Sequence, residues 1–250
     1  MPTNMDLATI AGIISFVLLV VVGFKTGQLE PSLINAHAVF VVMGGGFVSM
    51  LINTPMKYMI KSVTELYRMM FFDETAEIQR TIPMMVSLAE QCRSVGLSAL
   101  KDADPKHAGG FLARVSAAAL EYNDSNFVKH VIELEINQGA DEINEVANVY
   151  RTFGIQSPMF GLLGTLIGII GVLKQVSDPD SVGPAMAVAI SSAFYGILFA
   201  AMVCTPIAGK MRSRMVAQIK LKAMILEGVL EIMKGSIPMV VERRLQSYIA

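Results

Sequence analysis

Four stretches of the chain are almost free of charged side chains and long enough to cross a lipid bilayer. They are residues 7–24, 34–52, 157–173 and 184–206, and a bilayer core needs about 20 mostly apolar residues per helix. Short loops at residues 25–33 and 174–183 join them in pairs, whereas the long segment between the pairs is of mixed polarity. The pattern predicts an all-α membrane protein with four transmembrane helices.

The polar segments also carry helical periodicity and show no sustained alternation typical of strands. Apolar residues from Ile78 to Leu88 recur at helical spacing, and the segment that follows Asp124 does the same and should run straight into the third span. Residues 210–234 should continue the fourth span as a helix. Helix caps and breaks are expected at Asp73 or Thr75, at Gly109-Gly110 and at Asp124-Ser125.

Positive charge is distributed very unevenly along the chain. Of the 20 Lys and Arg residues, only Lys25 and Lys174 lie in the two short loops. Because cytoplasmic loops of membrane proteins are enriched in Lys and Arg, we expect the middle segment, the tail and both termini in the cytoplasm. The expected domains are residues 1–56 with spans one and two, 57–153 as a cytoplasmic helical domain, 154–209 with spans three and four, and 210–250 as a cytoplasmic helical tail.

Composition supports this class and argues against several others. The chain is 53% hydrophobic and 16% charged, with a mean hydropathy of +0.54 and a net charge of −1, which favours a membrane protein and gives no support for nucleic-acid binding. Cys92 and Cys204 are expected to be free thiols, and the three scattered histidines suggest no metal site. No basic residue precedes the first apolar run, so we expect a retained anchor and not a cleaved signal.

Small side chains form a narrow face on the third span. In PMFGLLGTLIGIIG, residues 158–171, the glycines are spaced by three, four and three positions, with Thr165 at the edge of their face; they are Gly161, Gly164, Gly168 and Gly171. The fourth span carries a similar stripe of Ala185, Ala189, Ser192, Gly196 and Ala200. Such stripes most often serve close helix packing, but the adjacent hydroxyls also allow a shared polar lining for an ion.

Apart from His37 near the outer end of the second span, the spans lack ionisable groups that could carry a proton. Spans two, three and four contain no Asp, Glu, Lys or Arg between their ends, and the first has only Asp6 at its start. Since intramembrane carboxylates usually serve proton relay, either the chain moves no ion or a partner supplies the charge. Pro158 and Pro206 stand at one membrane level, either as plain helix boundaries or as hinges.

Several motifs together resemble the MotA/PomA family of flagellar stator subunits. They are MDLATIAG, VVMGGG, FGIQSPMFGLLGTLIGIIGVL, DPDSVGPAMAVAISSAFYGIL and TPIAGKM, which cover all four spans in order. The resemblance implies a homo-oligomeric ring, a pentamer, around two copies of a MotB/PomB-like single-span partner that supplies a membrane Asp and anchors to peptidoglycan. It also implies a bacterial inner-membrane location, torque on the rotor protein FliG, and no cofactor other than permeant H⁺ or Na⁺.

The resemblance assigns roles to a few membrane residues. Pro158 and Pro206 match two prolines associated with coupling ion passage to motion, and Thr165 matches a threonine of sodium-using members. Ala193, with Ser192 beside it, stands where those members carry a second threonine. One matching hydroxyl leaves the ion open between H⁺ and Na⁺, with H⁺ slightly favoured.

The resemblance also marks a rotor-contact segment, AEQCRSVGLSALKD, in residues 89–102. Arg93 matches its basic residue, whereas Lys101 stands where an acidic residue is usual and Asp102 follows it. This charge difference implies either a changed contact or a rotor with altered complementary charges, because such contacts tune specificity.

Three other functions compete with a motor subunit. An energiser of outer-membrane processes of the ExbB/TolQ type usually has three spans, and the first apolar run here, which brings the number to four, argues against it. A small-solute transporter would be expected to show internal repeats or interrupted helices, which the sequence lacks. An enzyme is the weakest alternative, because no nucleophile–base set or phosphate loop is present.

Overall fold

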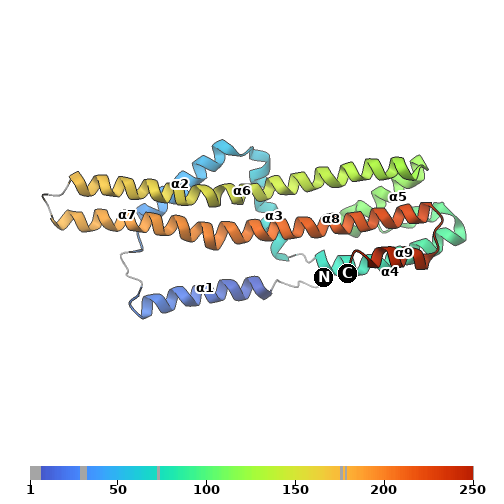
Figure 1. Cartoon of the computed structure of the whole chain (residues 1–250), viewed down its shortest axis with the longest axis horizontal. Helices are drawn as coiled ribbons and strands as arrows, with labels where there is room; N and C mark the ends of the chain where they lie inside the picture. The colour runs from blue at the N-terminus through green and yellow to red at the C-terminus, as the bar shows by residue number, and fades with distance from the viewer. Residues whose placement is uncertain (1–6, 29–32, 72–73, 175–176, 178, 250) are drawn as a thin grey trace. The chain divides into compact units, whose positions relative to one another are not determined.

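A computed structural model describes residues 7–28, 33–71, 74–174, 177 and 179–249, and every regular element in them is a helix. The all-α prediction is therefore confirmed for the described residues, whereas the expected cap at Asp73 and the acidic residue Asp6 lie outside them. The elements in chain order (Figure 1) are α1 Leu7–Lys25, α2 Ala36–Asn53, α3 Met56–Phe71, α4 Glu74–Val95, η2 Leu97–Asp102, η3 His107–Gly110, α5 Phe111–Tyr122, α6 Ser125–Lys174, α7 Pro179–Phe199, η4 Ala200–Cys204, α8 Thr205–Met233 and α9 Pro238–Gln246.

Three of the described helices are long and apolar enough to cross a membrane. They are α2, α6 and the continuous helical run Val182–Met233, while α1 contributes a shorter apolar helix, Ile10–Lys25. The helix α6 has 50 residues, or about 75 Å at 1.5 Å per residue. Because a hydrocarbon core is about 30 Å thick, only part of α6 can lie within a bilayer.

The chain folds into two compact units. Unit 1 comprises Met1–Phe72 with Glu145–Met211, and unit 2 comprises Asp73–Asn144 with Arg212–Ala250. The helices α6 and α8 contribute residues to both units. The helix α3 groups with unit 1, although the expected cytoplasmic domain began at residue 57; the assignment of each segment to membrane or cytoplasm stays a prediction.

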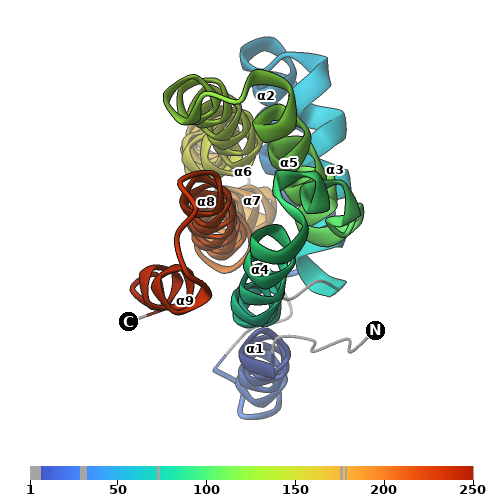
Figure 2. The ribbon, with the colours of Figure 1, turned by 90° about the vertical axis from the view of Figure 1, so that its right-hand side faces the viewer.

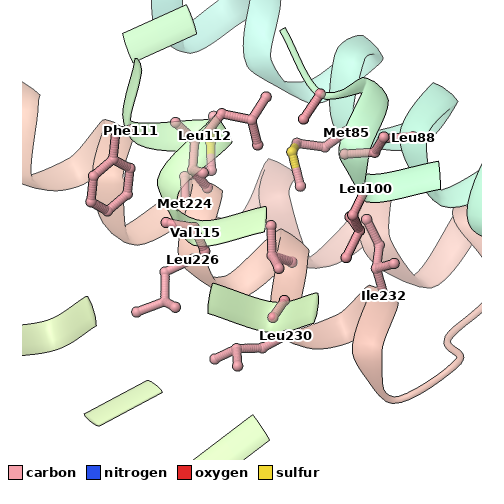
Figure 3. Close-up of a cluster of buried hydrophobic side chains, with 14 of the residues drawn as sticks. Met85, Leu88, Leu100, Phe111, Leu112, Val115, Met224, Leu226, Leu230 and Ile232 are labelled. Carbon is pink, nitrogen blue, oxygen red and sulfur yellow. The ribbon is translucent and has the colours of Figure 1, made fainter. Parts of the chain in front are cut away.

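Unit 2 has a well-packed apolar core. Its buried side chains come from α4, η2, α5, α6, α8 and α9, and Figure 3 shows those of Met85, Leu112 and Met224 pointing into a common interior. The apolar face expected on α4 is confirmed, since Ile78, Met85 and Leu88 are all buried. Burying these side chains removes apolar surface from water, which is the main term that stabilises such a bundle.

The last helix, α9, is anchored to the end of α8 (Figure 2). Glu231 is buried and accepts hydrogen bonds from Lys234 Nζ at 2.9 Å and Ser236 Oγ at 2.7 Å. Arg244 of α9 donates to Glu227 Oε1 at 3.0 Å. Because each buried carboxylate oxygen meets a donor, the turn between the two helices is fixed by charge-assisted hydrogen bonds.

The helix boundaries follow the local signals of the sequence. The Asp124 carboxylate accepts hydrogen bonds from the backbone N–H groups of Asn126 and Phe127 at 2.9 and 3.3 Å, as expected of an N-cap. Gly109 and Gly110 have φ values of +64° and +83°, a left-handed backbone that favours glycine, and they break the chain before α5. From Asp124 the helix runs without interruption to Lys174, as predicted.

The loop between α6 and α7 is shorter than expected. Residues 174–183 were expected to be non-helical, but α7 already begins at Pro179. Proline is well suited to the first turn of a helix because its fixed φ matches the helix and its missing N–H would have no intrahelical partner there.

The buried side chain of His107, just before the Gly109-Gly110 break, connects this segment to α4. His107 Nε2 lies 2.8 Å from Thr81 Oγ1, and the Thr81 hydroxyl donates its own proton to the Glu77 carbonyl oxygen. The threonine oxygen must therefore accept from an Nε2–H. Burial lowers the pKa of the His107 imidazole, although Glu77 and Asp104 oppose this shift, so the neutral ring is favoured in the folded chain.

Candidate functional site

The glycine face of α6 is covered by α7 of the same chain. A Cβ atom added at Gly168 would lie 2.6 Å from the Ala189 Cβ, and one added at Gly164 would lie 2.6 Å from the Ser192 Cβ. At Gly161 it would lie 2.8 Å from the Ser192 carbonyl oxygen. Because real Cβ atoms essentially never approach so closely, these positions require glycine for the observed helix separation.

The close approach is reciprocal and fades toward the end of α6. A Cβ added at Gly196 of α7 would lie 2.6 Å from the Ser157 carbonyl oxygen and 3.0 Å from the Pro158 Cα. At Gly171 it would meet only the Ala185 Cβ, at 3.7 Å, which is ordinary van der Waals contact. We call the contact between residues 157–171 of α6 and residues 185–196 of α7 the glycine seam; Figure 1 shows the two helices side by side.

The helix α2 packs on this pair from another direction. Its buried residues Ala38, Val42, Gly46 and Met50 recur every four positions and so form one stripe. A Cβ at Gly46 would lie 2.5 Å from the Phe153 ring, and a Cβ at neighbouring Gly45 would collide with the Phe160 ring. The glycines of VVMGGG thus make room for α6 aromatic rings, while α2 also contacts α7.

The Thr165 and Ser192 hydroxyl groups at the seam donate to backbone carbonyls. The Thr165 hydroxyl lies 3.0 Å from the Ala189 carbonyl oxygen of α7 and 3.1 Å from the Gly161 carbonyl oxygen of its own helix. The Ser192 hydroxyl donates to the Val188 carbonyl oxygen at 2.8 Å. A hydroxyl has one proton and two lone pairs, so each oxygen keeps the capacity to accept from water or to coordinate a cation.

The predicted ion-pathway residues differ in exposure. Ser192 is fully buried in the seam, whereas Thr165 and Ala193 are half-buried. The structure therefore brings Thr165 and Ser192 to one interface and leaves Thr165 and Ala193 partly open beside it. No carboxylate or basic side chain lies between residues 184 and 206 or between 152 and 173, and the described residues contain no cluster suited to a metal ion.

The two prolines lie within helices and not at their ends. Pro158 stands inside α6, and Pro206 stands at the second position of α8 in a helical run that extends from Val182 to Met233. The interpretation of Pro158 as a helix start is therefore wrong. Proline lacks an amide proton, so the carbonyl groups four residues earlier, at Gly154 and Met202, receive no α-helical hydrogen bond from it.

A π-helical turn accompanies the second proline. Residues Ala200–Cys204 form η4, in which the Thr205 N–H donates to the Ala200 carbonyl oxygen five residues earlier. A Cβ at Gly154 of α6 would lie 2.9 Å from the Cys204 Cβ, so the proline-affected turn of α6 lies against the π turn. Sequence reasoning missed Gly154 and Cys204. The available signal was their place in the turn before each proline, since Gly154 lies four positions before Pro158 and Cys204 two positions before Pro206.

The predicted rotor-contact residues all lie on the surface of unit 2. Arg93 is exposed in the last turn of α4, and Lys101 and Asp102 are exposed at the end of η2. Between them, Ala99 and Leu100 are buried in the core of unit 2. The segment is thus held by its apolar residues while its charged side chains face outward.

Comparison with known proteins finds relatives along the chain. A sequence model of the MotA/TolQ/ExbB proton channel family matches residues 107–224, which include all of the glycine seam. The chain is similar to members of this family over that region. Motility protein A of Treponema pallidum is 27% identical over 98% of this chain and 95% of its own length, and the chemotaxis protein PomA of Vibrio alginolyticus is 27% identical over 98% and 96%.

Solved structures agree with the fold. The flagellar MotAB stator complex from Bacillus subtilis contains a chain that is 26% identical and matches with a TM-score of 0.86, over 96% of this chain and 95% of that one. The C. jejuni MotAB structure matches with a TM-score of 0.87 at 22% identity, over 98% and 96%. The chain is therefore similar to these relatives and structures over nearly its whole length.

The glycine seam makes a matched pair of substitutions informative. We expect Gly161→Ala to destabilise the chain by about 1–3 kcal/mol, because the added methyl group meets α7 backbone that cannot move aside without separating the helices. Gly171→Ala should change stability by less than about 0.5 kcal/mol, because its methyl group finds ordinary contact. Denaturant unfolding of the purified chain in detergent measures both, and equal losses at the two positions would contradict the seam.

Proposed function

We propose that this chain is the ring-forming stator subunit of a bacterial flagellar motor, which works with a MotB-like partner to couple ion flow to rotation. The observation that carries this proposal is the full-length similarity to Motility protein A and PomA. The neutral character of the packed helices supports it, because such a subunit must obtain its ionisable group from another chain. The subunit is not an enzyme in this proposal, and it needs no cofactor beyond the permeant H⁺ or Na⁺.

The proposed topology has four membrane spans in the inner membrane with both termini in the cytoplasm. The spans are α1, α2, residues 157–173 of α6 and residues 184–206 of the helix that begins with α7. Support comes from the apolar character of these segments and from the Lys and Arg residues that concentrate outside the two short loops. Residues 57–153 and 210–250 then lie in the cytoplasm, apart from the part of α3 discussed below.

The proposed partner is a MotB/PomB-like chain with one span and a membrane Asp. The similar Bacillus subtilis chain was solved as part of a MotAB stator complex. The spans proposed here contain no carboxylate, so a partner chain would have to supply the one that binds the ion. A pentameric ring around two partner chains follows from the family resemblance. The glycine seam is already filled within the chain, so the partner helix should contact other faces of α6 and α7.

An energiser of the ExbB/TolQ type is the second candidate, because the family description covers both functions. Two observations favour the motor. Motility protein A and PomA match over 95% or more of their own lengths, and α1 provides the apolar helix that a fourth span requires. A small-solute transporter has less support, because the sequence shows no internal repeat and no charged side chain in the middle of a span.

Deleting the gene separates these functions. In the bacterium that carries it, we expect cells with assembled but motionless flagella, because stators supply torque and do not build the filament. Swimming in soft agar and electron microscopy of filaments measure the two parts. Loss of filaments, or normal swimming with impaired outer-membrane uptake, would contradict the proposal and favour the second candidate.

Thr165 is the proposed ion-pathway residue with the clearest geometry, together with Ser192 and Ala193. Thr165→Ala removes the only hydroxyl that links α6 to Ala189, and we expect ion-driven swimming to fall about tenfold, equivalent to about 1.4 kcal/mol in the barrier. Thr165→Ser keeps the hydroxyl and should retain most of the activity. Swimming speed in media with and without sodium measures the effect. Unchanged speed and ion dependence in Thr165→Ala would mean that Thr165 serves helix packing only.

Arg93, with Lys101 and Asp102, is the proposed rotor contact to FliG. We expect Arg93→Glu to abolish most swimming while membrane insertion and ring assembly persist, because reversing an exposed interfacial charge opposes docking. Lys129→Glu is the matched control, since Lys129 is also exposed in unit 2 but lies on α6. Full motility of the Arg93→Glu strain, or equal loss in both strains, would remove Arg93 from the contact.

A further inference from the structure

The helix α3 is fixed to unit 1 by one of its faces. Tyr58 and Leu66 of α3 pack against the buried cluster of Val146, Ala147 and Met211. Between them Ser62 is buried, and its carbonyl oxygen accepts a hydrogen bond from the Tyr150 hydroxyl at 3.0 Å. This face lies against α6 and the start of α8, so α3 has a defined orientation.

A second face of α3 is apolar and exposed. Met56, Ile60, Val63 and Tyr67 are 59%, 64%, 66% and 66% exposed, and their spacing of four, three and four positions places them on one stripe. An exposed apolar stripe of this length on an otherwise anchored helix indicates a surface that meets an apolar phase or a partner.

A third face of α3 is basic. Lys57, Lys61 and Arg68 each lie one residue after a member of the apolar stripe, and so about 100° around the helix from it. The described helix carries these three basic residues and one acidic residue, Glu65, for a net charge of +2. An apolar stripe flanked by Lys and Arg is the pattern of a helix that lies in a membrane interface.

The position of α3 in the chain fits the same surface. It begins three residues after the end of α2, and the exposed apolar residues of α2 continue to its last turn with Leu51 and Ile52. Thr54 ends α2 in extended backbone, and Pro55 precedes the first residue of α3. The chain therefore leaves a proposed span and enters at once a helix with a lipid-like face and a basic flank.

We propose that α3 docks in the headgroup layer of the cytoplasmic leaflet, with Met56, Ile60, Val63 and Tyr67 toward the acyl chains and its basic face toward acidic phospholipid headgroups. This inference rests on the proposed topology of α2 and goes beyond the motor function. It adds a peripheral contact by which unit 1 binds acidic lipid at the boundary of its spans. Acidic headgroups are the complement of the +2 charge, because anionic leaflets attract juxtamembrane Lys and Arg.

Depth-dependent quenching tests the orientation of α3. In a chain with Cys92→Ala and Cys204→Ala, a fluorophore is attached through Ile60→Cys on the apolar stripe, Thr64→Cys on the polar side, or Phe47→Cys in α2. The proteins are reconstituted in vesicles of phosphatidylcholine and phosphatidylglycerol that contain doxyl-labelled lipid. We expect strong quenching at positions 47 and 60 and at least several-fold weaker quenching at 64.

The outcomes separate this inference from the topology. Quenching at 47 without quenching at 60 would overturn the docking of α3 and leave the span intact. No quenching at 47 would overturn the topology itself and the docking with it. If the fluorophore at position 60 is shielded from quenching at high protein density and becomes quenched when the protein is diluted in excess lipid, a second copy of the chain, and not lipid, covers the stripe. That result would overturn the proposal.

The lipid class is tested by charge. Quenching at position 60 should fall several-fold when phosphatidylglycerol is omitted or when Lys57→Glu and Lys61→Glu are combined, and it should fall with added salt. Lys129→Glu, an exposed charge reversal in unit 2, should leave the signal unchanged. Equal quenching in vesicles with and without phosphatidylglycerol would overturn the acidic-lipid assignment, whatever the double variant does.

Discussion

The near-contact of two backbones at the glycine seam is the constraint on which the membrane part of this chain depends. At Gly161, Gly168 and Gly196 the opposing helix occupies the space that a side chain would need. In lipid there is little hydrophobic gain from bringing helices together, so their association depends on van der Waals contact and hydrogen bonds at short distance. The same short distance lets the Thr165 hydroxyl reach the Ala189 carbonyl oxygen at 3.0 Å.

The seam also decides where a partner can bind. Since α7 covers the glycine face, an additional helix must meet side chains on the remaining faces, where Leu162, Leu166 and Ile197 are exposed. These side chains are bulky and apolar, and they bring no charge. Residues 157–171 and 185–196 thus offer close internal packing, outer faces without charged side chains and hydroxyl oxygens at the edge of the seam. In the proposed motor, the ionisable group comes from the partner chain. The glycines of the seam therefore serve close packing of α6 against α7 and not the binding of charge.

The sequence predicted the elements better than their partners. The apolar helices, the Asp124 cap and the break at Gly109-Gly110 follow from local signals, namely apolar length, a capping carboxylate and paired glycines. The glycine spacing also showed that residues 161–171 form one face. It could not show that α7 covers that face, because a stripe of small residues fits any close helix, whether from this chain, another copy or a partner.

Two other features were hidden for related reasons. Two faces of α3 carry apolar side chains, so the periodicity of the sequence does not show which of the two is buried. The hydrogen bond from the Tyr150 hydroxyl to the Ser62 carbonyl oxygen identifies the buried face. The π turn Ala200–Cys204 lies just before Pro206, but a proline equally allows a kink, a stop or an uninterrupted helix with one missing bond. The helix that packs against the turn limits which of these conformations fits, and the sequence alone does not show which helix that is.

The two proline-affected turns give the long helices a defined place to bend. The carbonyls of Gly154 and Met202 receive no α-helical hydrogen bond from the proline four residues later, and Gly154 lies against Cys204 within the π turn. Elsewhere α6 and α8 are continuous, and a continuous α-helix resists bending because every turn is hydrogen-bonded. Motion that begins at the glycine seam would therefore concentrate at these turns, while the helical segments beyond them move as rigid bodies. If Pro158 and Pro206 serve the predicted coupling role, these two adjacent turns are where it would act.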